Sequence, residues 1–306
     1  MNTGGYRPFI WMLCGCAWFS AMSLLGSGLG KEGVPWQTLA TVRSGVAFLL
    51  ALIIAVIMGA KLVAVGPRAL WLRSIAGSCS MLSTFFALAN LHASEVLTLT
   101  NAFPVWVALL SWPMVGEKPS RGVWIAVIVA VCGVALAVYP REGDTATTQV
   151  FRLAPAIAAV AASVFTALAM LGLNRLKAIA PMAIVVHFSA VSTVFCAASF
   201  LLFPLRDGPD PFQSTEMTAR ILGIGVTAMI GQVFLTLAFS RGTATKISVV
   251  GLSQVAMVMG VEAAFGWKTF TPTNIFGTLL ILGPTAWLMV RERKSKRAPQ
   301  EPIPIE

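Results

Sequence analysis

The stretch FSAMSLLG at residues 19–26 recurs in the second half of the chain as FTALAMLG at residues 165–172. Most of the aligned positions are identical or exchange similar side chains, as Ser20 does with Thr166. A sequence that repeats itself in this way is typical of a chain built from two copies of one structural unit. The first question is therefore what kind of unit the chain contains twice.

The composition is that of a membrane protein, since 57% of the residues are hydrophobic, 11% are charged and the mean hydropathy is +0.81. The hydrocarbon core of a bilayer is about 30 Å thick, so a helix needs about 20 apolar residues to cross it. Segments of this kind lie at residues 8–27, 37–58, 70–91, 95–115, 122–139, 153–173, 182–204, 220–240, 245–265 and 273–290. The sequence therefore predicts an all-α membrane protein with ten transmembrane helices.

The repeat extends beyond the opening stretch and covers both halves of the chain. Other aligned positions are Pro35 with Pro181, GEK at 116–118 with GWK at 266–268, and Gly133 with Gly283. We expect five helices in residues 1–140, five in residues 150–290, and a basic, disordered tail at 291–306. Because five is odd, the second copy must enter the membrane from the opposite side. Such inverted repeats are the architecture of secondary transporters, although a duplicated scaffold is the alternative.

The basic residues indicate how the chain lies in the membrane. Most of the 22 Lys and Arg residues fall in alternate loops and in the tail, which begins RERKSKR at residue 291. The positive-inside rule then predicts that both termini are cytoplasmic, in the inner (plasma) membrane. The tail is of the kind that anionic membrane lipids attract. This distribution accounts for the net charge of +10 without a nucleic-acid partner.

The sequence offers little to support an enzyme. It contains no P-loop, no catalytic constellation of His, Cys and Ser, and no cluster with the spacing of metal ligands. The two histidines, His92 and His187, lie in separate segments, and all five cysteines lie in apolar ones. We therefore expect no enzymatic activity, no cofactor and no metal site. A membrane enzyme or lipid-handling scaffold, and a channel, remain as alternatives.

One stretch points to a particular family. ALANLHASEVLTLTNAFPVWVALLSWPMVGEK, at residues 87–118, together with TVRSGVAFLL at 41–50, resembles the EamA-type transporters of the drug/metabolite transporter superfamily. The marks shared with that family are Arg43, Ala87–Ala89, Ser94, Glu95, Pro104 and Glu117. The second copy departs from the pattern, because Trp267 aligns with Glu117 and Val255 aligns with Pro104. The resemblance implies a transporter with a central cavity lined by the first, third, fourth, sixth, eighth and ninth helices.

Polar side chains within the apolar segments are the candidates for contact with a cargo, because lipid-facing polar groups are costly. The candidates are Ser20, Thr98, Asn101, Thr166, Gln232, Gln254, Trp18 and Ser80. For the hydroxyl groups, helix–helix and local main-chain hydrogen bonds are the alternative. For Trp18 the alternative is packing or contact with lipid. We expect Ser20 and Thr166 to face each other near the centre of the bilayer.

Three ionisable residues are expected at a similar depth, near the end of the bundle away from the cytoplasm: Arg43, Glu95 and Glu262. We expect Arg43 to pair with one of the two carboxylates as part of a gate, or to orient an anionic group of the cargo. A structural or snorkelling arginine is the alternative. Proton coupling through Glu95 or Glu262 is left open.

Together these features predict a secondary active transporter that works by alternating access. The cargo is expected to be a small polar metabolite, with an amino acid or organic anion favoured and export as the direction. A multidrug or cation efflux transporter is the alternative within the same class. The sequence leaves open whether the protein is a monomer or a homodimer.

Overall fold

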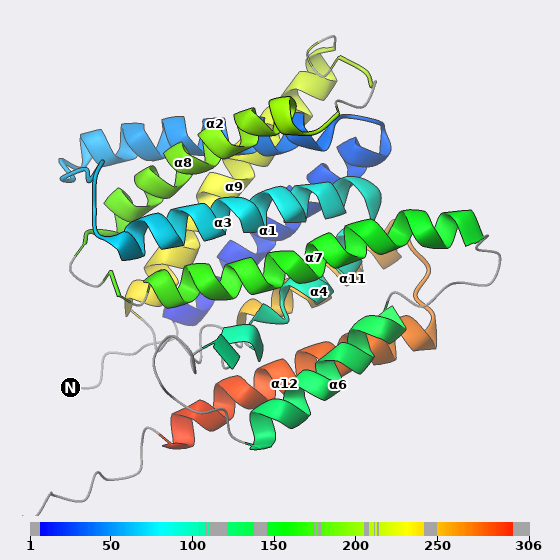
Figure 1. Cartoon of the computed structure of the whole chain (residues 1–306). Coiled ribbons are helices and arrows are strands. Elements are labelled where there is room, and N and C mark those ends of the chain that lie inside the picture. The colour runs from blue at the N-terminus through cyan, green and yellow to red at the C-terminus, as the bar shows by residue number, and fades with distance from the viewer. Residues whose placement is uncertain are drawn as a thin grey trace, which may run out of the picture.

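The computed structural model describes residues 7–103, 105–107, 109–110, 121–137, 146–173, 175–176, 179–204, 208–210, 212, 214–241 and 250–295. Its helices are α1 (Arg7–Lys31), α2 (Trp36–Ile57), α3 (Arg68–Asn90), α4 (Ala93–Thr100), α6 (Arg121–Ala137), α7 (Ala146–Leu173), α8 (Pro181–Leu202), α9 (Thr215–Arg241), α11 (Ser253–Ala264) and α12 (Pro272–Ser295) (Figure 1). These residues contain no β-strand, so the described part of the chain is all-helical.

Six of the described helices are long enough and apolar enough to cross a membrane. They are α1, α2 and α3 over their whole lengths, and the segments Leu153–Gly172 of α7, Met182–Leu202 of α8 and Thr215–Leu235 of α9. The surface of the bundle matches this role, because large apolar side chains such as Ile53, Leu201 and Ile128 are exposed. The exposed apolar side chains and the helical backbone are the features that a bilayer requires.

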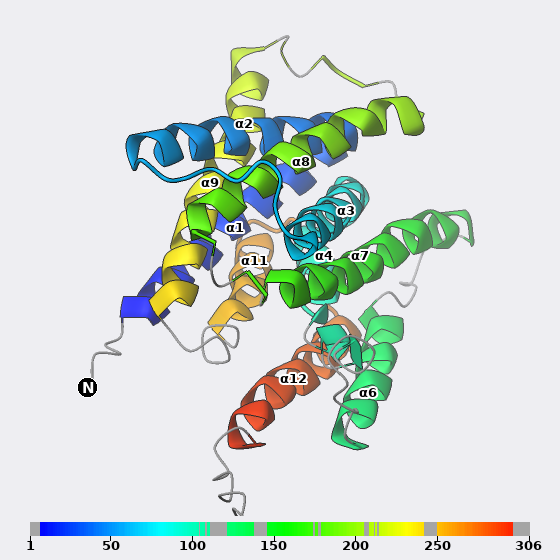
Figure 2. The ribbon, with the colours of Figure 1, turned by 60° about the vertical axis from the view of Figure 1, so that its left-hand side comes forward.

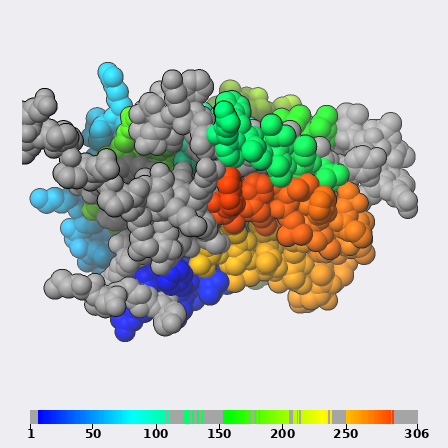
Figure 3. Space-filling view, turned by 90° about the horizontal axis from the view of Figure 1, so that it is seen from below, coloured from blue at the N-terminus to red at the C-terminus, as the bar shows by residue number. Residues whose placement is uncertain are grey.

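The helices are arranged in layers between two paired edges. α2 packs against α8 at one edge, and α6 packs against α12 at the opposite edge (Figures 1 and 2). Between these edges lie α1, α3, α7 and α9, in which α1 packs against α9 and α3 against α7. Figure 3 shows the second edge from below, with α6 in green beside α12 in orange-red. The short helices α4 and α11 lie inside, in contact with each other.

Helix α1 runs to Lys31, past the predicted end at residue 27. The helix continues through three glycines, of which Gly26 and Gly30 pack against α3 and Gly28 lies near Arg220 of α9. A Cβ placed on Gly30 would lie 2.3 Å from Cα of Ala89, so the two helices cross at this point without a side chain between them. Close approach of this kind is what small residues provide between membrane helices.

The fourth predicted helix, at residues 95–115, is interrupted by a turn, after which residues 103, 105–107 and 109–110 are helical again. α4 ends at Thr100, and a turn follows at Asn101 and Ala102. The proline at position 104 has no N–H and cannot bond to the carbonyl of Thr100, which weakens the helix at this point. Pro104 and Glu117 themselves lie outside the described residues. Hydropathy did not reveal the interruption because the residues on both sides of it are apolar.

Two other helix ends also differ from the prediction. α11 begins at Ser253, whereas the predicted helix began at residue 245, and residues 242–249 lie outside the described part. α12 continues to Ser295, past residue 290, where the tail was expected to begin. The extension adds Arg and Lys residues to the last turn, where the helix dipole favours positive charge.

Candidate functional site

The end of α11 turns the chain back toward α4. Gly266 has a φ of +65°, a left-handed conformation that glycine adopts without steric cost. Its N–H donates to the carbonyl of Ala263 at 3.1 Å, and the N–H of Trp267 donates to the carbonyl of Glu262 at 2.9 Å. This pair of bonds is a Schellman motif, which satisfies carbonyls that the last helical turn leaves open. The reversal brings the next residue, Lys268, into the bundle, where it is 6% exposed.

A tight corner brings the start of α4 to the same place. Only Leu91 and His92 separate α3 from α4, and both have extended backbone conformations. Ser27 of α1 donates its hydroxyl hydrogen to the carbonyl of Leu91 at 2.9 Å, which satisfies a buried main-chain acceptor. Ser94 and Glu95, in the first turn of α4, therefore lie near the end of α1.

Lys268 and Glu95 form a buried ion pair. The distance from Lys268 Nζ to Glu95 Oε1 is 3.0 Å, and the two side chains are 2% and 8% exposed. Lys268 Nζ also donates to Ser94 Oγ at 3.2 Å and lies 4.9 Å from the centre of the Phe270 ring. Taking both charges out of water is costly, so loss of either partner would leave the other in an unfavourable environment. The pair therefore depends on α4 and the α11–α12 connection staying together.

A second carboxylate lies beside this ion pair. Glu262 Oε1 accepts from the main-chain N–H of Ser94 at 3.4 Å, at the start of α4, where the helix dipole favours negative charge. Glu262 Oε1 also lies 3.8 Å from His92 Nδ1, to which Lys31 Nζ donates at 2.9 Å. We call the five charged or titratable side chains at this place the charged cluster: Lys31, His92, Glu95, Glu262 and Lys268.

The charged cluster is closely packed. A cavity of about 10 Å³ adjoins the ion pair, which is room for about one water molecule. Its lining consists of Ser94, Glu95, Thr98, Met259, Lys268, Phe270, Asn274 and Thr278. The cluster connects α1 and α4 in the first half of the chain with α11 and α12 in the second. In this conformation it leaves no room for a metabolite to pass.

A second, more exposed ion pair lies at the same end of the bundle. Arg220 of α9 donates to both carboxylate oxygens of Glu32, at 2.9 and 2.6 Å, immediately after the end of α1. The two side chains are 31% and 42% exposed. Exposed pairs contribute little to stability, so the buried pair is the stronger connection between the halves.

The structure brings Glu95 and Glu262, which the sequence placed at a similar depth, into one cluster, but Arg43 is not with them. The nearest group that Arg43 contacts is the sulfur of Met81, to which Nη1 donates. The expected pairing of Arg43 with a carboxylate is therefore wrong in this conformation, because Lys268 occupies that position beside Glu95. Hydropathy assigned Lys268 to a loop, and only the chain reversal after α11 returns it to the interior.

Thr98 and Asn101 make local hydrogen bonds. Thr98 Oγ1 donates to the carbonyl of Ser94 at 2.7 Å, and Asn101 Nδ2 donates to the carbonyl of Leu97 at 2.8 Å. In both bonds the acceptor is the main-chain carbonyl four residues earlier in the chain. The bond from Asn101 satisfies a carbonyl near the end of the helix. Their side chains thus have partners within α4 in this conformation.

Ser20 and Thr166 do not face each other, which corrects the expectation drawn from the repeat. Ser20 Oγ donates to the main-chain carbonyl of Gln254 at 3.4 Å, so it connects α1 with α11. Thr166 Oγ1 lies 2.7 Å from Ser80 Oγ and connects α7 with α3. Both hydroxyls point to neighbouring helices, but to different ones, because α1 packs on α11 at Ser20 and α7 packs on α3 at Thr166.

Gln232 and Trp18 lie away from the charged cluster. Gln232 lines a pocket between α2, α8 and α9, whose other lining residues are Ile54, Met58, Ala60, Ala180, Met182, Val185, Met229, Val233 and Leu237. The pocket volume is about 390 Å³, and its lining is otherwise apolar. Trp18 is 38% exposed on the surface of α1, in keeping with its lipid-facing alternative.

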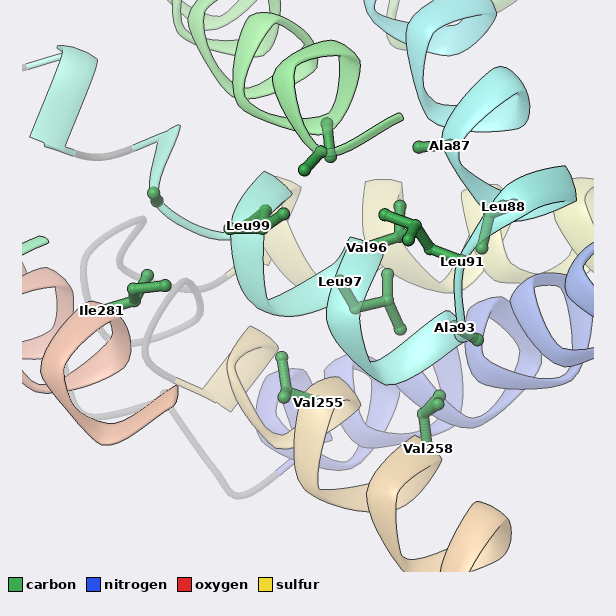
Figure 4. Packing of buried hydrophobic residues seen from close by; sticks show 13 residues of the cluster. Ala87, Leu88, Leu91, Ala93, Val96, Leu97, Leu99, Val255, Val258 and Ile281 are labelled. Carbon is green, nitrogen blue, oxygen red and sulfur yellow. The ribbon is translucent and has the colours of Figure 1, made fainter. Parts of the chain in front are cut away.

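The two short helices meet at the centre of the bundle. Val255 and Val258 of α11 lie in one buried cluster with Val96 and Leu97 of α4 (Figure 4). The last turn of α4 and the first turn of α11 adjoin interruptions in helical segments. Near the second interruption, the thiol of Cys16 on α1 lies 3.6 Å from the carbonyl of Gly251. Interrupted helices of this kind frame the substrate sites of many secondary transporters.

Sequence reasoning missed three members of the charged cluster: Lys31, His92 and Lys268. A signal for Lys268 was present, because the repeat aligns GWK at residues 266–268 with GEK at residues 116–118. That match was used only to align the halves. Lys31 and His92 gave no pattern of their own, since each is a single polar residue at a helix end.

Comparison with known proteins shows the fold and gives a family match for the first half of the chain. Residues 7–139 match the EamA-like transporter family. A solved crystal structure with 16% sequence identity has a TM-score of 0.63 to this chain, and the match covers 94% of this chain and 98% of the other. At that identity the likeness shows the fold alone.

Relatives with transporter names cover most of the chain. The pseudopaline exporter CntI of Pseudomonas aeruginosa is 27% identical over 268 residues, which is 87% of each chain. A probable transport protein of Saccharomyces cerevisiae is 26% identical over 251 residues, which is 74% of this chain and 68% of that one. Solute carrier family 35 member G1 of Mus musculus is 21% identical over 237 residues, 74% of this chain and 64% of that one.

These matches agree with the helical bundle, with its apolar exposed surface and with the residues that carried the resemblance. The chain is a multi-pass membrane protein. Its first half resembles the EamA-type transporters of the drug/metabolite transporter superfamily, and relatives with transporter names cover most of its length.

Proposed function

We propose that the protein is a secondary active transporter that exports a small polar metabolite by alternating access, with the charged cluster as the gate at one end. The observation that carries the proposal is the buried ion pair between Lys268 and Glu95. It joins residues 1–140 to residues 150–290, which we propose are the two repeats. A contact that holds two halves shut at one end is what a gate requires, because it must break when that end opens.

The packing of the helices supports an inverted repeat. Under the repeat, α1, α2, α3 and α6 correspond to α7, α8, α9 and α12. The contact of α3 with α7 then corresponds to that of α9 with α1, and the contact of α3 with α8 corresponds to that of α9 with α2. The contacts of α2 with α8 and of α6 with α12 correspond to themselves. This is the pattern that a two-fold axis between the halves would produce.

The interrupted helices support a cargo site between the halves. α4 ends at Thr100 and α11 begins at Ser253, positions that differ by nearly the same displacement that aligns the two copies. In this class of transporters, interrupted helices expose polar main-chain groups to the substrate. We therefore propose that cargo contacts come from nearby polar side chains. They are Ser20, Thr98, Asn101 and Gln254, with Ser80 and Thr166 on the flanking helices.

The physical basis of gating is a change in hydration. While the cluster is packed, Lys268 and Glu95 stabilise each other in a medium of low dielectric constant. When α4 separates from α11 and α12, water enters and solvates each charge separately, which offsets the lost attraction. The positive-inside distribution of Lys and Arg supports an orientation in which this gate faces away from the cytoplasm. The conformation described here is then closed on that side.

Proton coupling fits best at Glu262. Its Oε2 atom is buried and has no hydrogen-bond partner, whereas Glu95 is paired with Lys268. A proton on Glu262 would remove its attraction to His92 and Lys268, and so would favour separation of α11 from α4. The export direction is supported by the similarity to CntI, which is an exporter.

Transport itself is tested in two stages. A thermal-shift screen of the purified protein against a metabolite library finds ligands, because a ligand that binds the folded state raises its melting temperature. Counterflow of a hit in proteoliposomes then tests transport. If lipophilic cations raise the melting temperature and no amino acid or organic acid does, the proposed cargo class is wrong.

The gate is tested with matched variants in the same liposomes. We expect Glu95→Gln and Lys268→Met each to reduce counterflow by at least tenfold, and Glu32→Gln, in the exposed ion pair, to leave it within twofold of wild type. Equal effects of the buried and exposed variants would show that burial of the pair is not what the transport cycle uses.

A further inference from the structure

The interface of α2, α3 and α8 contains two arginines without an acidic partner among the residues that the structure describes. Arg43 of α2 donates to the sulfur of Met81. The guanidinium of Arg73, on α3, lies 4.3 Å from the centre of the Phe188 ring on α8. The Nε atoms of both arginines are buried and have no hydrogen-bond partner. Thioether sulfur and an aromatic ring are weak partners for a guanidinium, which stays charged at any pH of interest.

Other polar groups line the same interface. His187 of α8 is 6% exposed, and its Nδ1 lies 2.8 Å from Ser74 Oγ of α3, while its Nε2 is buried without a partner. One turn further along, Ser78 and Ser192 are joined by a hydrogen bond of 2.8 Å. The contact between α3 and α8 is therefore a polar seam inside the membrane bundle.

Under the proposed repeat, this interface corresponds to that of α9 with α2, which also joins the two halves and has apolar packing along part of its length. There α9 packs on α2, and a Cβ placed on Gly225 would lie 2.4 Å from Cβ of Val46. Ile224, Ala228 and Leu39 share one buried apolar cluster in this interface. A bundle of this architecture thus packs these two helices without charge, so the polar seam of α3 and α8 is not required by the fold.

The charges in the seam are unfavourable as they stand. Arg43 and Arg73 repel each other electrostatically. Each also loses hydration within the bundle, and a buried cation without a counter-charge is costly in a membrane protein. An anion between the guanidinium groups would cancel the repulsion and supply acceptors for the open Nε donors. Guanidinium groups bind carboxylate and phosphate oxygens with particular strength.

We propose that the interface of α2, α3 and α8 binds an anionic oxygen group, a carboxylate or a phosphate, through Arg43 and Arg73. The anion comes either from a soluble organic acid or phosphate, or from the headgroup of an anionic lipid. The charged cluster is formed by other helices, so this site is separate from the gate. The proposal concerns binding alone, so the outcome of the transport experiments does not affect it.

The test measures the melting temperature of the purified full-length protein in a neutral detergent. Succinate, inorganic phosphate or phosphatidylglycerol is added at constant ionic strength, with chloride and phosphatidylcholine as controls. We expect a saturable rise with at least one anion. Arg43→Gln and Arg73→Gln should weaken the apparent affinity at least tenfold, whereas Arg68→Gln, at the exposed start of α3, should leave it unchanged.

The melting temperatures of the Arg73 variants without any added anion provide a second test. Without any added anion, Arg73→Gln removes an uncompensated charge and should raise the melting temperature, and Arg73→Lys should not. A rise with phosphatidylglycerol alone identifies the lipid as the source, and a rise with succinate or phosphate identifies a soluble anion. If no anion raises the wild-type melting temperature more than the controls do, or if Arg73→Gln responds as wild type does, the proposal is overturned.

Discussion

The buried ion pair permits a quantitative prediction from a double-mutant cycle. Lys268→Met removes the cation and leaves the Glu95 carboxylate, which is 8% exposed, without a counter-charge. Breaking a buried pair in this way costs about 3–5 kcal/mol in free energy of unfolding. Glu95→Gln in the same background removes the remaining charge and should restore most of that loss. The coupling energy between the two positions should therefore be about 2 kcal/mol or more, at the upper end for residues in contact.

The control cycle uses the exposed pair at the same end of the bundle. Glu32 and Arg220 are 42% and 31% exposed, and their hydrogen bonds are as short as those of the buried pair. Pairs with this exposure have coupling energies of about 1 kcal/mol or less. The two cycles thus compare similar geometry at different burial, which isolates the effect of the environment.

Both cycles can be measured by reversible unfolding in mixed micelles of a nonionic detergent and SDS, followed by tryptophan fluorescence. The free energy of unfolding is obtained for wild type, the two single variants and the double variant of each pair. A coupling energy at Glu95 and Lys268 no larger than that at Glu32 and Arg220 would refute the reasoning. It would mean that water reaches the cluster in the folded state.

Two further predictions concern contacts between membrane helices. Gly30→Ala should destabilise the protein by about 1–3 kcal/mol, because its Cβ would meet the Ala89 main chain at 2.3 Å. Gly260→Ala, at a helical position with nothing within 4 Å, is its control and should be neutral or stabilising. Ser80→Ala should cost about 0.6 kcal/mol, the average for a hydrogen bond between membrane helices. In a Thr166→Val background, Ser80→Ala should not lower the free energy of unfolding any further. If it still does so by the same amount, the effect comes from a hydrogen bond of Ser80 other than the one with Thr166.

The helices could be predicted from the sequence because apolar length is what the bilayer selects. Their ends could not, because neighbouring helices determine them. α1 continues through its glycines since Gly30 packs on Ala89, a contact that no local pattern indicates. Likewise, α4 stops at Thr100 within an apolar run, where hydropathy is the same on both sides of the turn.

The carboxylates of the charged cluster could be predicted, but their partner could not. Glu95 and Glu262 stood out as acidic residues at a similar depth in apolar segments. Depth along a helix does not specify which helices are neighbours, so Arg43 was an equally reasonable partner. Lys268 reaches Glu95 because Gly266 reverses the chain, and the effect of that single φ angle appears only in three dimensions.

The repeat predicts which segments correspond, but correspondence differs from contact. Ser20 and Thr166 occupy matching positions, yet each bonds to a different helix. With an axis between the halves, a residue lies opposite its own counterpart only if it lies on the axis. Under the proposed repeat, α2 and α6 contact their own counterparts, α8 and α12, and neither Ser20 nor Thr166 is on one of these helices.

The two halves also differ in charge at the positions that match the buried ion pair. The displacement that aligns Lys268 with Lys118 aligns Glu95 with Thr245, which is not acidic. Both counterparts lie outside the described residues, but their identities show that the same pair of charges is not repeated at the matching positions. If the proposed inverted repeat held no such difference, the states open to either side would be nearly equal in energy. One buried pair at one end adds its coupling energy to one state only. A coupling of about 2 kcal/mol corresponds to a bias of about thirtyfold toward the conformation described here. Cargo or protons would have to offset that bias to open the gate.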